Sequence, residues 1–418
     1  MRYLTCLIIS ILFLYPIKAQ VTDSGPVKAA AEWPERYMPL LKGKKVAIFA
    51  NHTSLVGNKN LVDTLHSQGV DIRRIFGPEH GFRGTADAGA KVANEKDPAT
   101  GIPIVSLYGK KRRPSAEDLR DVDILIFDVQ DVGTRFYTYI SSLEECMNAC
   151  IEQKKTLMVL DRPNPNGYYV DGPVLDTAFR SFIGMQPIPV VHGMTMAEYA
   201  QYLLCEERTK PADPYKLVQV GLQPNPREKS LPAAHFKLTV ITIPYYDHQF
   251  QYAVPVGPSP NMPDMSAILR YPSTCFFEGT ALSEGRGTDK PFQLIGHPDL
   301  PKTMVSFTPR SKPGAMDPKL KDKRCYGWDL SGNWRQLYKS INRQLQLTWL
   351  LEAYRLFPDK DSFFINKGVT FNRLAGGATL REQIKAGLTE EEIRLSWQPA
   401  LEAFKQIRKK YLLYPDFE

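Results

Sequence analysis

The chain has 418 residues, of which 43% are hydrophobic and 23% are charged. This composition excludes a disordered or fibrous protein, and the length predicts about two domains with a full hydrophobic core. The 53 Lys and Arg residues exceed the 45 Asp and Glu residues only slightly and form no long run, so the charge gives no reason to expect nucleic-acid binding.

Residues 1–20 are predicted to form a secretory signal peptide. Arg2 precedes the apolar stretch 7–15, and the small residue Ala19 follows Pro16, which is the layout of such a leader. The apolar run is shorter than the roughly 20 residues that cross a bilayer, so cleavage is favoured over a membrane anchor. We therefore expect a secreted protein without stable membrane insertion, located in the periplasm.

Residues 32–210 alternate short apolar runs with amphipathic stretches. The pattern predicts strands at 46–50, 72–76, 102–107, 122–129, 157–160 and 188–191, and helices at 61–68 and 140–153. Segment 122–129 is almost continuously apolar, as is typical of a central parallel strand. Thr195 and Glu198 have the spacing of a capping box before another helix. We predict an α/β domain with a Rossmann-like, doubly wound parallel sheet.

Residues 209–232 are rich in Pro, Lys and Gln and predict a connector, after which residues 235–418 form a smaller C-terminal α/β domain. Strands are predicted at 238–243, near 275–277, at 292–295 and at 304–307, followed by long helices at about 334–357 and 389–413. The apolar residues of these two helices recur at helical spacing, which indicates packing against a core.

Five cysteines follow the predicted leader, an odd number that excludes a fully paired set of disulfides. Cys146 and Cys150 lie one turn apart in a predicted helix, where buried thiols are expected more often than a bridge or a metal pair. We expect no disulfide scaffold.

Polar residues follow the predicted strands at their carboxyl ends, where ligands bind in open α/β sheets. The residues in these positions are His52, Glu79, His80, Arg83, Asp128, Asp131, Arg135, Arg162, Asn164 and His192. Any one of them could serve a turn or a helix cap, but five such strand ends together predict a polar active site. Glu278, Glu284 and Arg286 add a glycine-flanked charged loop from the second domain.

Several enzyme classes lack their motifs in this sequence. No strand is followed by G-x-G-x-x-G, the P-loop and H-E-x-x-H patterns are missing, and G-x-S-x-G is only half met around Ser259, which disfavours dinucleotide enzymes, NTPases, metallopeptidases and serine hydrolases. The histidines include no closely spaced pair of ligands. We therefore expect no metal and no cofactor.

Carboxylate chemistry remains as the most economical interpretation. Glycoside hydrolysis requires a protonated carboxyl group that donates to the leaving oxygen, and usually a second group that stabilises or attacks the cation-like centre. Glu79, beside His80 and Phe82, is the candidate general acid. The candidates for the second role are Asp128, Asp131, Glu278 and Glu284, which the sequence alone does not rank.

At these positions the chain resembles the NamZ-type exo-β-N-acetylmuramidases, peptidoglycan hexosaminidases formerly described as a domain of unknown function. The resemblance covers most of the mature chain and rests on the segments 50–53, 78–84, 128–139, 161–166 and 277–287. It implies a Rossmann-like domain and a smaller α/β domain with the active cleft at their interface. It also implies release of N-acetylmuramic acid from the non-reducing ends of peptidoglycan fragments or muropeptides, with the glutamate as acid.

The resemblance suggests roles for further residues. An arginine that pairs with the lactyl carboxylate of N-acetylmuramic acid would reject N-acetylglucosamine, and Arg135, Arg162 and Arg286 are the candidates. Tyr137, Tyr139 and Phe82 are candidates for stacking on the sugar. The second catalytic role goes to Asp128 or Glu278, while assistance by the 2-acetamido group of the substrate stays open. The other expected substrate-binding residues are His52, His80, Arg83, Asp131, Asn164, His192 and Glu284.

Two functions of other classes are also compatible with the sequence. A noncatalytic muropeptide-binding protein would bind without turnover. A periplasmic esterase or amidase that uses Ser259 or Ser283 with His192 would attack acyl groups or stem peptides and leave glycosidic bonds intact.

Overall fold

The computed structural model describes residues 27–79, 81–83, 95–206, 215–220 and 236–418. The predicted signal peptide and His80 lie outside the described residues. In the described part of the chain, no helix is both long and apolar enough to span a bilayer.

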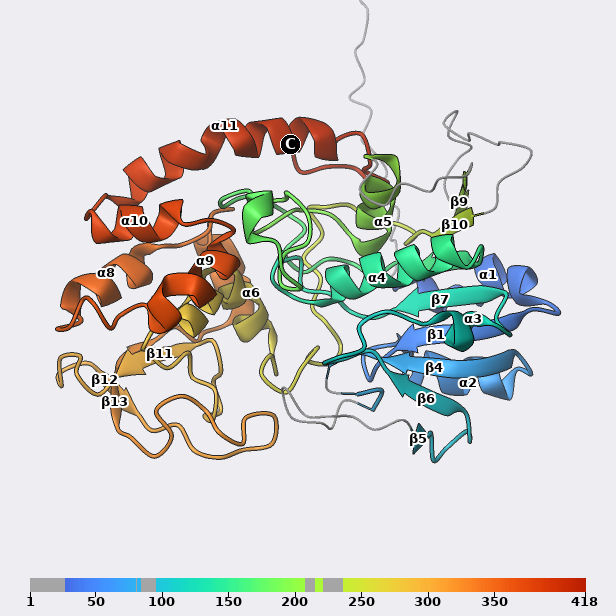
Figure 1. Ribbon diagram of the computed structural model, residues 1–418, viewed down its shortest axis with the longest axis horizontal. Coiled ribbons are helices and arrows are strands. Elements are labelled where there is room, and N and C mark those ends of the chain that lie inside the picture. Colours follow the sequence, from blue (N-terminus) through green and yellow to red (C-terminus); the bar gives the residue numbers. More distant parts are fainter. Residues whose placement is uncertain (1–26, 80, 84–94, 207–214, 221–235) are drawn as a thin grey trace, which may run out of the picture.

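An eight-stranded sheet with the order β5-β6-β4-β1-β7-β8-β10-β9 forms the first part of the molecule (Figure 1). All neighbouring strands are parallel except the edge strand β5. The strands are β1 (Lys45–Ala50), β4 (Asp71–Gly77), β5 (Glu95–Lys96), β6 (Pro103–Ser106), β7 (Ile124–Asp128), β8 (Thr156–Leu160), β9 (Tyr215–Val220) and β10 (Phe236–Ile241), beside a small hairpin of β2 (Leu55–Val56) and β3 (Lys59–Asn60). The predicted α/β class is confirmed.

Apolar residues on both faces explain why this sheet is doubly wound. Alternate residues of β7 enter two separate core clusters: Leu125 and Phe127 lie in one, Ile124 and Ile126 in the other. The first cluster includes residues of α4 (Tyr139–Glu152) and α5 (Met196–Cys205), and the second includes residues of α1 (Pro34–Leu41) and α2 (Leu61–Ser67). A strand buried on both faces reads as a continuous apolar run, as the sequence indicated.

The strand order reverses direction beside β1. From β1 the chain adds β4 and then β6 on one side, whereas β7, β8 and β10 lie on the other. The carboxyl ends of β1 and β7 therefore flank the topological switch point, where open α/β sheets form their ligand crevice. The short helix α3 (Ala116–Leu119) precedes β7.

The structure corrects two strand predictions. We predicted segment 238–243 as a strand of the C-terminal domain, but β10 pairs in parallel with β8 and β9 and thus belongs to the large sheet. Segment 188–191 forms no sheet strand and makes only isolated bridges from Val191 to Thr134 and Asp171. Strand β10 occupies the position beside β8, so segment 188–191 packs as an extended loop.

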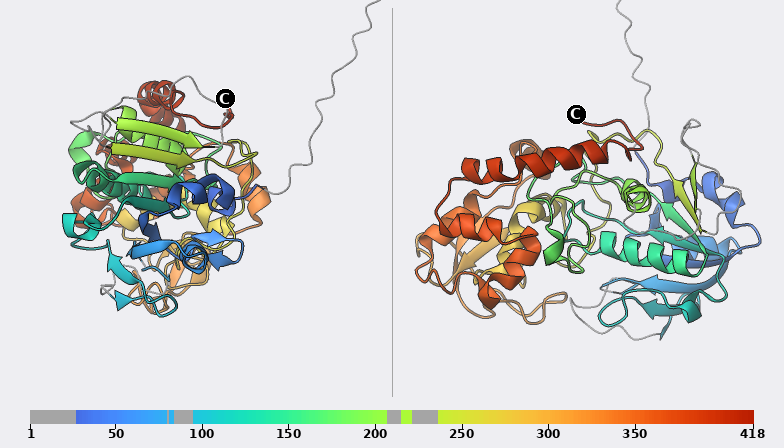
Figure 2. Two further views of the ribbon diagram at one scale, coloured as in Figure 1. Left: turned by 90° about the vertical axis from the view of Figure 1, so that its right-hand side faces the viewer. Right: turned by 45° about the horizontal axis from the view of Figure 1, so that its top comes forward.

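The C-terminal part contains a three-stranded antiparallel sheet of β11 (Leu294–His297), β13 (Cys325–Asp329) and β12 (Val305–Phe307). The helices of this part are α6 (Met265–Thr274), α7 (Trp334–Ser340), α8 (Thr348–Leu356), α9 (Val369–Ala375), α10 (Thr379–Lys385) and α11 (Glu390–Arg408). Helix α11 extends from this part towards α5 (Figures 1 and 2).

Three further predictions for this part change. The expected strand near 275–277 is a 3-10 helix, Cys275–Gly279. The expected helix 334–357 is interrupted between α7 and α8, where Asn342 and Arg343 have φ values of 51° and 55°, outside the helical region. The last helix ends at Arg408 rather than near 413.

The capping box of Thr195 and Glu198 is confirmed at the start of α5, and the five cysteines after the leader are free thiols.

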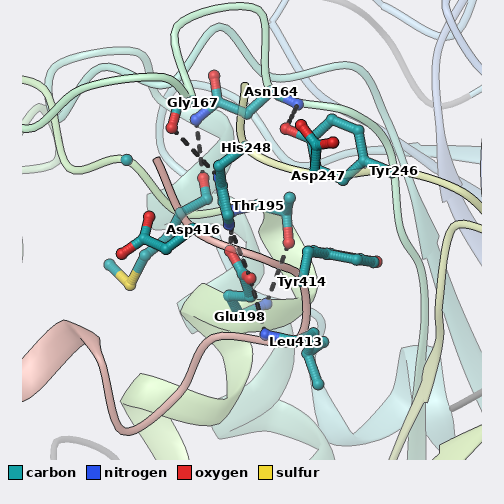
Figure 3. Close-up of polar contacts among 12 residues, drawn as sticks. Asn164, Gly167, Thr195, Glu198, Tyr246, Asp247, His248, Leu413, Tyr414 and Asp416 are labelled. Carbon is teal, nitrogen blue, oxygen red and sulfur yellow. Dashed lines mark hydrogen bonds and ion pairs between the residues drawn. The ribbon is translucent and has the colours of Figure 1, made fainter. Parts of the chain in front are cut away.

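A buried ion pair fastens the C-terminal tail to α5 (Figure 3). Glu198 Oε1 accepts hydrogen bonds from His248 Nε2 at 3.0 Å and from Leu413 N at 2.8 Å. His248 Nδ1 lies 3.2 Å from the carbonyl oxygen of Gly167. The two ring nitrogens of His248 thus lie against two acceptors, the Glu198 carboxylate and the Gly167 carbonyl oxygen. Although burial opposes ionisation, His248 holds the pKa of Glu198 below its usual value.

Replacing this carboxylate is predicted to destabilise the fold strongly. Glu198→Gln removes the carboxylate that holds the buried His248 ring and the Leu413 amide, and breaking a buried pair in this way costs about 3–5 kcal/mol. The free energy of unfolding is measured by urea denaturation. The matched control is Glu392→Gln, because Glu392 occupies the same capping-box position on α11 but is exposed. Equal losses in the two variants would contradict the role of the buried pair.

Candidate active site

A cavity of about 280 Å³ brings together residues from distant parts of the chain. Five of the residues predicted for the site line it: Glu79, which follows β4; Tyr137 and Tyr139 at the start of α4; and Glu278 and Arg286 from the C-terminal part. The proline-rich segment 258–263 contributes Ser259, Asn261 and Met262 to the lining. Two glutamates thus border one cavity although 199 positions separate them in the sequence.

A chain of ion pairs supports the C-terminal side of the cavity. Arg286 lies 2.8 Å from Glu278 Oε1 and 3.4 Å from Glu284 Oε1, and Lys319 Nζ lies 2.8 Å from Glu284 Oε2. Burial raises the pKa of Glu278 despite the attraction of Arg286. For Glu284, burial is outweighed by Lys319 and Arg286, which hold its pKa below the usual value. Glu284 therefore remains the counter-charge of Arg286, while the proton affinity of Glu278 is increased.

Two tyrosines form a rigid wall of the cavity. The rings of Tyr137 and Tyr139 lie 4.8 Å apart in an edge-to-face arrangement. Both hydroxyl groups approach the carbonyl oxygen of Pro258, at 3.2 and 3.4 Å, and Asn51 donates to Tyr139 Oη at 2.7 Å. Burial raises the pKa of Tyr137 well above its usual value, so these side chains are neutral donors and apolar surfaces.

Asp128 and Arg162 form a buried ion pair outside this cavity lining. Arg162 Nε and its terminal nitrogen lie 2.6 and 2.9 Å from the two oxygens of Asp128, and the same nitrogen donates to the carbonyl oxygen of Leu55 at 3.0 Å. Both side chains are almost completely buried. The pair joins the carboxyl ends of β7 and β8, and Arg162 extends the connection to β2, which follows β1 in the chain.

Other arginines predicted for the site are also engaged elsewhere. Arg135 is completely buried and donates to the carbonyl oxygens of Pro173, Ile188 and Leu374. Burial lowers the pKa of Arg135 to about 9. Arg83 pairs with two aspartates of its own domain, Asp63 and Asp97.

The remaining predicted residues support loops near the strand ends. Asp131 accepts from Gly133 N at 2.6 Å, and burial raises its pKa to about 7. Asn164 shapes a turn by accepting from Asn166 N and donating to the carbonyl oxygen of Met194. These contacts are the turn chemistry expected of such residues.

Two histidines of the prediction have different surroundings. Burial lowers the pKa of His192 to about 3, so this side chain is neutral, and its Nδ1 accepts from Met194 N at 3.2 Å. His52 Nε2 lies 2.9 Å from the carbonyl oxygen of Gly257, next to the proline-rich segment that borders the cavity. Among the described residues, no group of three His, Cys, Asp or Glu side chains is arranged to hold a metal ion.

Sequence reasoning did not identify several lining residues, among them Tyr108, Arg112, Phe182 and Tyr271. Arg112 belongs to the basic run 110–113 that follows β6. Its position after a strand of the parallel sheet was the available signal, because the carboxyl ends of such strands meet at one edge.

A parallel α/β sheet whose carboxyl edge faces a cavity with two glutamates is an arrangement suited to glycoside hydrolysis. Family models for exo-β-N-acetylmuramidase NamZ match the chain over residues 46–266 (N-terminal part) and 269–414 (C-terminal part). The chain therefore belongs to the NamZ family, and it is a glycoside hydrolase of the exo-β-N-acetylmuramidase type.

Individual relatives agree with this assignment. The chain is 37% identical over 399 residues to the peptidoglycan β-N-acetylmuramidase NamZ of Bacillus subtilis strain 168, covering 90% of this chain and 89% of that protein. Two crystal structures of DUF1343 family proteins from Bacteroides fragilis are also similar. One is 42% identical with a TM-score of 0.80 and covers 94% of this chain and 100% of its own. The other is 26% identical with a TM-score of 0.75 and covers 93% and 99%.

The Asp128 and Arg162 pair is predicted to act mainly on stability. Asp128→Asn leaves the Arg162 guanidinium buried without its counter-charge, which costs about 3–5 kcal/mol. Urea denaturation measures the loss, and Asp121→Asn, which removes the partner of the part-buried Arg74, is the milder control. An Asp128→Asn variant with unchanged unfolding free energy would contradict the structural role.

Proposed function

We propose that this protein is an exo-acting glycosidase that releases N-acetylmuramic acid from the non-reducing ends of peptidoglycan fragments. The family relationship supports the reaction type, and the name of the Bacillus subtilis relative supports peptidoglycan as the substrate class. The observation that carries the proposal for this chain is that Glu79 and Glu278 line the same cavity. The leader-like sequence of residues 1–20 supports secretion, with the periplasm as the site of action.

Glu79 is the proposed general acid. It is half-buried where the chain leaves β4, at the carboxyl edge of the sheet, and it faces a cavity with aromatic walls. A carboxyl group in this position donates its proton to the glycosidic oxygen as the bond breaks. The leaving sugar departs with that proton, and the positive charge that develops on the terminal ring requires a second group.

Glu278 is the proposed second group. Asp128, the other leading candidate, is bound at both oxygens by Arg162 and is absent from the cavity lining. Glu278 lines the cavity and is held through one oxygen by Arg286. A carboxylate fixed by its partner is positioned to stabilise the cation-like centre or to orient the 2-acetamido group of the substrate.

The wall of Tyr137 and Tyr139 is proposed to bind the apolar face of the terminal sugar. Their hydroxyl groups are held by the Pro258 carbonyl oxygen, so the rings need no ordering when a ligand arrives. Such preorganisation lowers the entropy cost of binding. The substrate ring would then lie between the tyrosine wall and the two glutamates.

The experiment that tests the acid compares two substrates with leaving groups of different acidity. Glu79→Gln is predicted to lower turnover of N-acetylmuramyl-β-1,4-N-acetylglucosamine by about 10²- to 10⁴-fold, because its alcohol leaving group needs a proton. Turnover of 4-nitrophenyl β-N-acetylmuramide should fall much less, since nitrophenolate leaves without protonation. Free N-acetylmuramic acid is quantified by mass spectrometry.

Glu278→Gln is the matched variant in the same assay. The second group is needed for either leaving group, so this substitution is predicted to lower turnover of both substrates to a similar extent. Equal effects of Glu79→Gln on the two substrates would contradict its assignment as the acid. If the wild-type protein releases no N-acetylmuramic acid from either substrate, the proposed function itself is wrong.

A further inference from the structure

The charged residues that line the cavity are not equally available to a ligand. Arg286 is paired with Glu278 and Glu284. Arg112 lines the same cavity, and among the described residues no carboxylate lies within ion-pair distance of its guanidinium. Within the described part of the chain, the cavity therefore presents two glutamates, one arginine that is paired with carboxylates, and one arginine that is not.

The surroundings of Arg112 fix its orientation but leave its donors accessible. The guanidinium carbon lies 4.4 Å from the centre of the Phe182 ring, in a cation–π contact. Stacking on a ring uses the face of the guanidinium, whereas its N–H groups point outward in its plane. Arg112 is solvent-exposed, so a ligand in the cavity can reach these donors without displacing a carboxylate of any described residue.

Arg112 and Phe182 also lie between the cavity and a neighbouring hollow, because they line both. Both residues line a second hollow of about 330 Å³, together with Glu144, Glu145 and Arg180. A substituent that projects from a sugar in the first cavity towards this hollow passes Arg112. The planar guanidinium group of an arginine binds a carboxylate through two parallel hydrogen bonds.

We propose that Arg112 is the specificity-determining residue that binds the lactyl carboxylate of the terminal N-acetylmuramic acid. This inference rests on the proposed function and replaces the three arginines considered from the sequence. Arg135 is occupied by backbone carbonyls, Arg162 by Asp128, and Arg286 by the two glutamates. The carboxylate would otherwise enter a cavity bordered by Glu79 and Glu278, where like charges repel it.

The pairing also predicts how the enzyme treats a modified lactyl group. Converting the carboxylate to an amide removes its charge and one of its acceptor oxygens, so the bidentate pair with Arg112 is lost. A lactyl group that carries a peptide through an amide bond has the same change at this position. We therefore expect the protein to prefer N-acetylmuramic acid with a free lactyl carboxylate.

The test uses 4-nitrophenyl β-N-acetylmuramide and the same compound with its lactyl carboxylate converted to a carboxamide. The wild-type protein is predicted to prefer the carboxylate by about 10- to 100-fold in kcat/KM, as expected for a charge-assisted pair. Arg112→Gln should bring this ratio close to one by lowering kcat/KM for the carboxylate alone. Arg112→Lys should restore part of the preference.

Arg180→Gln is the matched control, because Arg180 lines the second hollow but not the cavity with the glutamates. It should keep the wild-type ratio. The ratio does not depend on the amount of folded protein, so a loss of stability does not imitate the effect. An Arg112→Gln variant that retains the preference overturns the inference while the proposed function stands. Absence of cleavage of both compounds by the wild-type protein overturns both.

Discussion

The buried ion pair between Asp128 and Arg162 fixes the carboxyl edge of the sheet, on which the rest of the site depends. It joins the ends of β7 and β8, and Arg162 also binds the carbonyl oxygen of Leu55, the first residue of β2. Ser54 Oγ donates to the carbonyl oxygen of Asp128 and strengthens the same junction. Three loops at the topological switch point are thereby held together. Burying two charges is costly, but leaving one of them unpaired is costlier, so the geometry has few alternatives.

This junction divides the polar residues at the strand ends into two groups. One group, with Asp128, Arg162 and Asn164, holds the loops by contacts within the protein. The other, represented by Glu79 and Tyr137, borders the cavity, which the C-terminal part completes with Glu278. The proposed chemistry uses only the second group. The first group makes it possible because a proton donor acts efficiently only when its position is fixed before the substrate binds.

The sequence predicted the fold best where apolar runs recur at regular intervals along the chain. Alternation of apolar runs predicted the parallel sheet, and the capping box predicted the start of α5. The sequence did not predict that β10 belongs to the large sheet. An apolar run shows that a strand is buried but not which strand it pairs with. The interruption between α7 and α8 was missed because apolar spacing continues across it, whereas the positive φ values of Asn342 and Arg343 break the helix.

The residues of the active site were also predicted only in part, because the sequence pattern does not show the direction of a side chain. The position of a residue after a strand indicates which edge it occupies, but not whether its side chain faces a ligand or a neighbouring loop. Glu79 and Arg162 satisfy that rule equally, yet only Glu79 lines the cavity. Arg112 was overlooked because a short basic run resembles an exposed surface. Its significance depends on Phe182, 70 positions further along the chain, and on the absence of a carboxylate partner among the described residues.

The central claim is that the cavity between Glu79 and Glu278 holds the terminal sugar. The most direct measurement is a crystal structure of the Glu79→Gln variant with intact N-acetylmuramyl-β-1,4-N-acetylglucosamine. The account predicts the N-acetylmuramic acid ring in this cavity, with the glycosidic oxygen at residue 79 and the lactyl carboxylate at Arg112. A disaccharide bound elsewhere, such as in the groove between α8 and α10 near Leu351 and Ile384, would contradict it.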